Sequence, residues 1–119
     1  MAQIHLADGL LTLALSRAEK IQAFHSDISV PLENVVSVEP TSDIWSHIRG
    51  VRAPGTGVPR IVLLATMRFK GGRDFCALYF GKPGVIVTLS QAKFARLLVS
   101  TETWERAIDI AHEVTLLRG

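Results

Sequence analysis

With 119 residues, of which 48% are hydrophobic and 20% charged, the chain has the length of one domain and a composition unlike that of disordered proteins. No apolar run approaches the roughly 20 residues that span a bilayer, and no basic start of a secretion signal is present, so we expect a cytoplasmic protein. The single cysteine excludes an internal disulfide, in agreement with a reducing compartment.

The net charge of +2 conceals an uneven distribution of charge along the chain. Between residues 49 and 82, seven basic side chains are accompanied by one acidic residue, Asp74, whereas the remaining residues are net acidic. A basic segment of this kind is the main electrostatic feature of the sequence. Its basic residues are Arg49, Arg52, Arg60, Arg68, Lys70, Arg73 and Lys82.

The first element predicted is a β-hairpin with Asp8-Gly9 at its turn, because Asp-Gly favours the positive-φ positions of a two-residue turn. Leucines alternate with smaller residues from Leu11 to Leu15, which is the period of a strand with one buried face. The short runs "AEKIQAFH", "ISV" and "NVVSVEP" are interpreted as further strands.

The run "TSDIWSHI" could begin with one helical turn, but it is too short to decide. The next stretch, residues 48 to 62, is rich in glycine, proline and arginine and is interpreted as a loop, with Pro54-Gly55 in a type II turn. After it, residues 61 to 69 have the alternation of a strand, and Gly71-Gly72 turns the chain into "RDFCALYF". The runs "GVIVTLS" and "FARLLVS" add two more strands.

The period changes near the end of the chain, where helical spacing predicts one long helix over about residues 102 to 117, with Trp104 filling the end of a barrel. About seven antiparallel strands and one helix predict a single, mainly β domain over residues 1 to 119. The strands would form a small barrel or an orthogonal sandwich capped by the C-terminal helix.

Several segments resemble a known family. The runs "VPLENVVSVEP", "IRGVRAPGTGVPRIVLLATMRF", "GGRDFCALYF" and "FARLLVST" are similar to small bacterial pleckstrin-homology-like (PH-like) proteins of actinobacterial type. The resemblance covers nearly the whole chain and implies a seven-stranded barrel with a C-terminal helix, without implying a particular activity. Inositol-lipid-binding PH domains place basic residues around their first hairpin loop, whereas this chain has Asp8-Gly9 there.

No motif in the sequence indicates catalysis, a cofactor or a metal site. Gly50 and Gly55-Thr56 have the spacing of a P-loop but lack its lysine, and an apolar strand follows them in place of a helix. The four histidines and Cys76 have no metal-ligand spacing, and Cys76 is interpreted as a buried structural residue. We therefore expect a protein that is not an enzyme.

The first functional hypothesis is a protein-interaction module that binds a protein or peptide, or a second copy of itself, at an exposed strand edge. The alternative is binding of an anionic small molecule or membrane surface through the basic segment. A more distant alternative is binding of nucleic acid, which is not expected because the aromatics of that segment are assigned to packing. The candidate anion-binding residues are Arg49, Arg52, Arg60 and Arg73.

Overall fold

The chain begins with the predicted hairpin. In the computed structural model, which describes residues 1–118, β1 (Gln3–Ala7) pairs with β2 (Leu10–Ala14). Asp8 and Gly9 connect them with φ of 54° and 73°, the two positive values that a type I′ turn requires. Leu11 is fully buried, so the alternation in this segment correctly predicted a strand with one face on the core.

The predicted strand "AEKIQAFH" is instead a helix, α1 (Arg17–Ala23). A capping box starts it: the Ser16 hydroxyl accepts from the Glu19 N–H, and the Glu19 carboxylate accepts from the Ser16 N–H. Phe24 ends the helix in the left-handed region. The chain then returns as β3 (Ile28–Pro31), which pairs with β2 and completes a three-stranded sheet.

The remaining strands form a second sheet with the order β4-β8-β9-β7-β6-β5. Its pairs are antiparallel except β7 and β9, which run parallel, so the prediction of an all-antiparallel sheet was wrong. The strand β9 lies between β7 and β8 in the sheet. It runs antiparallel to β8, the strand before it in the chain, and therefore has the same direction as β7. The bounds are β4 (Val35–Thr41), β5 (Val51–Val58), β6 (Val62–Phe69), β7 (Gly72–Tyr79), β8 (Gly84–Leu89) and β9 (Arg96–Ser100).

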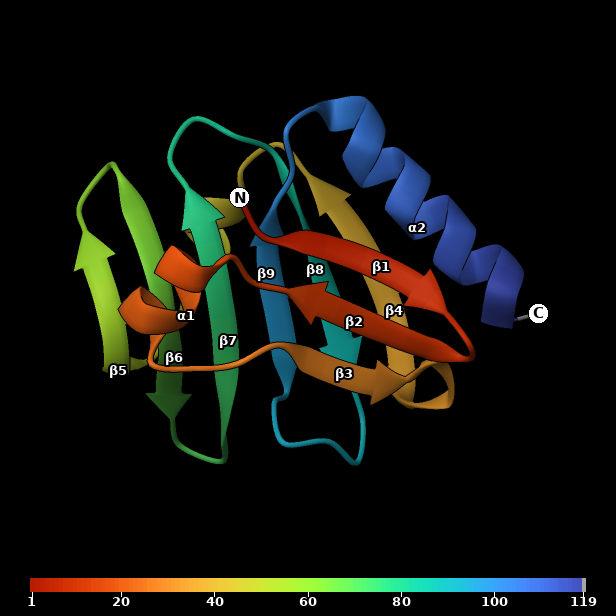
Figure 1. Cartoon of the computed structure of the whole chain (residues 1–119), viewed down its shortest axis with the longest axis horizontal. Coiled ribbons are helices and arrows are strands. Elements are labelled where there is room, and N and C mark those ends of the chain that lie inside the picture. The colour runs from red at the N-terminus through yellow and green to blue at the C-terminus, as the bar shows by residue number, and fades with distance from the viewer. Residues whose placement is uncertain (119) are drawn as a thin grey trace.

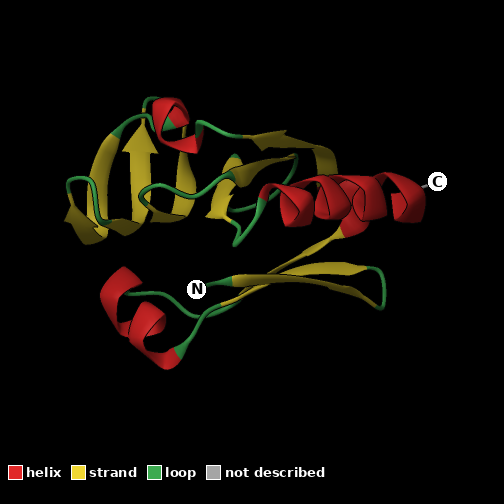
Figure 2. Ribbon diagram, turned by 90° about the horizontal axis from the view of Figure 1, so that it is seen from above, coloured by secondary structure: helices red, strands yellow, loops and turns green. Residues whose placement is uncertain are grey.

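Residues 1–118 form nine strands in two separate sheets and no closed barrel, so the prediction of a seven-stranded barrel was wrong, whereas its mainly β class with a C-terminal helix is confirmed. Figure 1 shows β1 to β3 crossing in front of the larger sheet, and Figure 2 shows the two sheets as separate layers. The main apolar core lies between these layers. It includes Leu11, Leu64, Phe75 and Leu97, all of them fully buried.

A second apolar cluster lies on the opposite face of the six-stranded sheet, called here the outer face. It contains Leu63, Cys76 and Leu98, and the 3₁₀ turn η2 (Ile44–His47) covers it with the fully buried side chain of Ile44. Both faces of the large sheet are therefore apolar. Another 3₁₀ turn, η1 (Leu32–Asn34), connects β3 to β4.

The C-terminal helix, predicted over about residues 102 to 117, is α2 (Trp104–Arg118). It packs against β4 and β8, and Ala107, Ile110 and Val114 form its buried face. Trp104 does not fill the end of a barrel: it is 43% exposed, because it lies outside the apolar face that those three residues define.

The glycine-rich stretch that was predicted to be a loop contains the edge strand β5. Its pairing with β6 is interrupted between Arg52 and Gly55, so Pro54-Gly55 lies at an irregularity within the strand and not in a type II turn. Gly55 has a φ of 137°, and a Cβ there would collide with Cα of Ala65. Only glycine allows this approach of the two strands.

Candidate functional site

Each sheet ends in two strands that have an unpaired edge: β1 and β3 in the smaller sheet, β4 and β5 in the larger one. The free N–H and C=O groups of an edge strand can pair with another chain, and proteins usually protect such edges. What covers each of these edges therefore determines where a further strand could be added.

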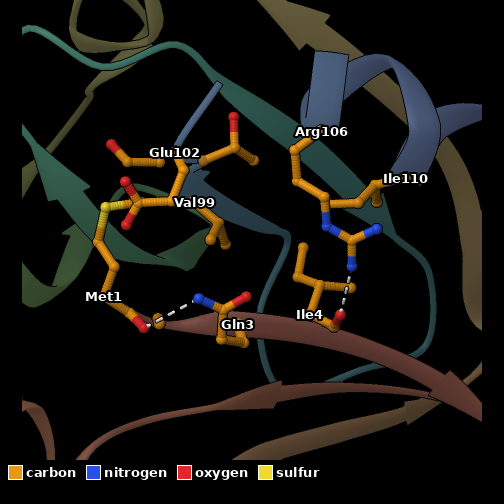
Figure 3. Close-up of a pocket in the computed structure, with 10 residues that line it drawn as sticks. Met1, Gln3, Ile4, Val99, Glu102, Arg106 and Ile110 are labelled. Atoms are coloured by element: carbon orange, nitrogen blue, oxygen red, sulfur yellow. Dashed lines mark hydrogen bonds between the residues drawn. The ribbon is translucent and has the colours of Figure 1, made fainter. Parts of the chain in front are cut away.

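Arginines from α2 bind the backbone of two edge strands. Arg106 Nη2 donates to the carbonyl oxygen of Ile4 in β1 at 3.2 Å, and Figure 3 shows this side chain reaching across to the strand. Arg118 Nη1 donates to the carbonyl oxygen of Val36 in β4 at 3.0 Å. Each guanidinium occupies a backbone acceptor and adds bulk and charge beside the strand, which opposes pairing with another chain.

Edge strand β5 is protected in a similar way. Arg52 Nη1 donates to the carbonyl oxygen of Gly57 at 3.0 Å, and Arg68 Nε donates to that of Ala53 at 2.8 Å. Pro54 removes one N–H, and the register shift bends the strand. The stretch that was interpreted as a loop is thus an edge strand whose irregularity and arginines disfavour pairing.

Strand β3 is different. Within residues 1–118 it is the one edge strand whose backbone receives no side-chain hydrogen bond. Its one side-chain hydrogen bond joins the hydroxyls of Ser29 and Thr12 at 2.9 Å and engages no backbone group. The strand's last residue, Pro31, has no N–H, so its backbone donors are those of Ile28, Ser29 and Val30. In Figure 1, β3 forms the lower border of the front sheet.

A cavity of about 310 Å³ lies directly beside β3. One wall is β3 itself, and the other is the connection between β8 and β9, residues 91 to 94. Ile28, Val30 and Phe94 provide apolar lining, while His25 and Lys93 provide polar groups. The volume is at the lower end of the range for small-molecule sites and is sufficient for one large side chain.

The His25 ring packs against two aromatic rings at this cavity, which also contact each other edge-on at 5.7 Å between centroids. Its centroid lies 5.2 Å from that of Phe75 and 5.5 Å from that of Phe94. His25 Nδ1 lies 2.7 Å from the carbonyl oxygen of Ser26, which can only accept, so Nδ1 is the donor of this hydrogen bond. Nε2 then accepts from the Lys93 ammonium at 3.4 Å.

Of the charged groups at the cavity, Asp27 is paired with a group of opposite charge within the described part of the chain and Lys93 is not. Asp27 accepts from the N–H of Leu15 at 2.8 Å and pairs with Lys20 at 3.7 Å. Lys93, in contrast, has no carboxylate partner within residues 1–118. Its contacts are His25 and the ring of Phe94, whose centroid is 5.5 Å from Nζ. The cavity therefore offers an apolar surface with one available cation at its border.

The structure does not bring the four candidate arginines together. Arg49 and Arg73 lie near the same end of the large sheet, but on different faces, because the side chain of Asp74 that Arg49 binds projects opposite to that of its neighbour Arg73. Arg60 lies at the other end of that sheet, in the β5–β6 turn. Arg52 is bound to its own strand.

Asp74, the single acid of the basic segment, has a structural environment. Its carboxylate is 1% exposed and accepts from Arg49 Nε at 2.8 Å and Nη2 at 3.1 Å. Arg96 donates to it through Nε at 3.1 Å and Nη2 at 2.7 Å, and also binds the carbonyl oxygen of His47. Arg49 stacks on Phe69, with Cζ 4.0 Å from the ring centroid. Part of the positive charge is thus neutralised inside the sheet.

Two other titratable groups are held in internal contacts. Burial raises the pKa of the Cys76 thiol to about 12, with a further contribution from Asp74. Tyr79 donates to the Glu19 carboxylate at 2.5 Å, and burial together with this carboxylate raises the pKa of Tyr79. The prediction that Cys76 is buried is confirmed, and the raised pKa makes it a poor nucleophile.

Residues 1–118 contain no group of three or more acidic, histidine or cysteine side chains that could hold a metal ion. None of the helices in that range is long and apolar enough to cross a membrane. The cavity at β3 was missed by sequence reasoning because its two walls are far apart in the chain; His25 and Lys93 are 68 residues apart. The alternation of "ISV" indicated the strand, but no local pattern indicated its partner wall.

Comparison of the chain with protein-family models, curated proteins and solved structures finds no significant match in any of the three.

Proposed function

We propose that this chain is a non-catalytic interaction module that binds an extended peptide segment of another protein along the free edge of β3. The observation that carries the proposal is the contrast among the four edges: arginines bind the backbones of β1, β4 and β5, whereas the backbone of β3 receives no such contact within residues 1–118. A peptide that adds a strand there would form main-chain hydrogen bonds.

The cavity beside β3 supplies a binding site for a side chain of the peptide, in addition to the main-chain hydrogen bonds of the short edge. Since β3 has four residues, main-chain pairing gives few hydrogen bonds, and specificity needs a pocket for a side chain of the peptide. The cavity lined by Ile28, Val30 and Phe94 fits a large apolar side chain. Lys93 at its border favours a peptide with an acidic residue next to the apolar one.

The experiment is selection of a random peptide library on the immobilised protein, followed by N-methylation of each backbone nitrogen of a selected peptide in turn. An added strand points alternate N–H groups at its partner, so N-methylation should abolish binding at every second residue and be tolerated between them. Equal sensitivity at all positions, or no selected peptide, would contradict the proposal.

A matched pair of variants locates the binding site. Ala92→Trp fills the cavity and should abolish binding of the selected peptide, whereas Ala18→Trp places the same side chain on an exposed position of α1 and should leave binding unchanged. Thermal unfolding of both variants verifies that each is folded. Binding that survives Ala92→Trp at full affinity would exclude the cavity.

The other hypotheses remain predictions. Anion binding through Arg49, Arg52, Arg60 and Arg73 receives no support from a common site, since Arg49 is paired with Asp74, Arg49 and Arg73 lie on different faces, and Arg60 is remote from both. The PH-like resemblance is supported by the helix after the last strand. The parallel pair and the two separate sheets differ from the antiparallel barrel that it implies.

A further inference from the structure

A second exposed surface lies on the outer face of the six-stranded sheet, away from β1 to β3. Ile61 and Phe80 are neighbours there, because the N–H of Phe80 donates to the carbonyl oxygen of Ile61 at 3.0 Å. They are 62% and 53% exposed. The ring of Trp45, from η2, meets that of Phe80 edge-on at 5.7 Å between centroids. We call Trp45, Ile61 and Phe80 the Trp45 surface.

The indole N–H of Trp45 is an unusual feature of this surface. Its Nε1 atom is buried, and it has no hydrogen-bond partner among residues 1–118. Buried polar groups are nearly always paired, and an unpaired donor destabilises the protein. The exposed Phe80 and Ile61 beside Trp45 have the composition of the centre of a protein interface, where tryptophan and other aromatics are enriched.

Two small cavities meet at Trp45. One, of about 200 Å³, lies toward β5 and is lined by Arg52, Gly57 and Val58. The other, of about 240 Å³, lies toward the end of β7 and is lined by Asp43 and Phe80. The surface is therefore hollow on both sides of the indole. It has a cationic group on one side and an acidic group on the other.

The charged groups at these two cavities can still form ion pairs with a partner molecule. The Asp43 carboxylate forms no hydrogen bond or ion pair within residues 1–118, where its contacts are through the backbone. Arg52 uses one N–H of five on the carbonyl oxygen of Gly57. Lys82, also at the second cavity, is paired with Glu102 at 3.6 Å. Asp43 and Arg52 are thus the groups of opposite sign that remain available.

We propose that the Trp45 surface binds a second copy of this chain in a two-fold symmetric dimer. A two-fold axis that lies in the interface plane near Trp45, perpendicular to the direction from Asp43 to Arg52, places the Asp43 side of one copy opposite the Arg52 side of the other, twice. The surface is then apolar at its centre and complementary to itself in charge. A partner with charges of one sign alone would match only one of the two sides. The dimer leaves both β3 edges free, because β3 lies on the other side of the large sheet.

Sedimentation equilibrium over a wide range of protein concentration tests this proposal. We expect a reversible monomer–dimer equilibrium, and Phe80→Ser and Ile61→Ser should each weaken it about tenfold or more, as for central interface residues. The controls Ile21→Ser and Leu116→Ser remove exposed apolar side chains elsewhere and should leave the equilibrium unchanged. A monomer at every concentration, or a dimer insensitive to Phe80→Ser and Ile61→Ser, would overturn the proposal.

Exchange of charge tests the two-fold arrangement itself. Asp43→Arg alone and Arg52→Asp alone should each weaken the dimer, because each places like charges opposite one another. A mixture of the two variants should restore association, since the mixed dimer pairs opposite charges at both contacts. Restoration should decrease with increasing salt. Failure of the mixture to associate better than either variant alone would refute this geometry.

Discussion

Replacement of Asp74 by alanine gives the most direct test of how the large sheet is stabilised. The carboxylate accepts four hydrogen bonds from two guanidinium groups and is 1% exposed. When it is removed, Arg49, at 44% exposure, is solvated by water, but Arg96, at 16%, remains as a poorly solvated charge between β7 and β8. The cost therefore arises mainly from Arg96.

Loss of one partner of a buried ion pair costs about 3 to 5 kcal/mol, and the retained bond from Arg96 to His47 places the value near the lower limit. We expect Asp74→Ala to lower the free energy of unfolding by about 3 kcal/mol and the melting temperature by roughly 10 °C. Urea and thermal unfolding measure both quantities. Asp109→Ala removes an exposed aspartate of α2 and should change stability by less than about 0.5 kcal/mol.

A double variant separates the unpaired charge from other effects. If the cost comes from unpaired Arg96, then Asp74→Ala combined with Arg96→Met should be at least about 1 kcal/mol more stable than the sum of the single changes predicts. A cost below about 1 kcal/mol for Asp74→Ala, or simple additivity in the double variant, would refute this explanation.

Three further predictions concern other internal contacts. Burial and Asp74 raise the pKa of Cys76 to about 12, so an aromatic disulfide reagent at pH 8 should label it only as fast as the chain unfolds; rapid labelling in the native state would contradict this. At Glu19, burial alone would raise the pKa, but hydrogen bonds from the Ser16 N–H and the Tyr79 hydroxyl outweigh it and lower the pKa. The stability that Glu19 contributes is therefore present above its unfolded pKa of about 4.3 and is lost as the pH falls through the lower folded value. Glu19→Gln should remove this dependence in urea unfolding measured across pH, and an unchanged profile would oppose the assignment. Gly55→Ala should destabilise by about 3 kcal/mol or more because its Cβ would collide with β6, whereas Gly9→Ala, with open space around it, should cost about 1 kcal/mol; equal effects on the melting temperature would count against the collision.

Local patterns predicted those elements whose signals are contained within a few residues. The Asp8-Gly9 turn is one example, because its backbone conformation depends on the two residues themselves. The run "AEKIQAFH" is short and bounded by Ser26-Asp27, which predicted a strand, but Ser16-x-x-Glu19 is a capping-box sequence and is the local signal for the start of α1.

Other features depend on partners that are distant in the sequence. The irregular path of β5 became recognisable only when β6 lay beside it, since Gly55 is required by the approach of Ala65. Likewise, the sequence presents Arg49 as a group for an external anion, whereas in the fold its guanidinium is paired with the buried carboxylate of Asp74. The sequence gives the number of charged residues. The charge available to an external ligand depends on which of these residues are already paired inside the fold.

The position of β9 has a consequence for the order in which the protein folds. This strand joins the β4–β8 pair to the β7-β6-β5 group, and it is the last strand of the chain. Until about residue 100 has left the ribosome, the nascent chain can form only two partial sheets with unpaired inner borders. Such borders are prone to non-native association, and contacts that close late across long loops slow folding. Assembly of the large sheet therefore awaits β9, and a chain that stops before β9 should be retained by chaperones or degraded.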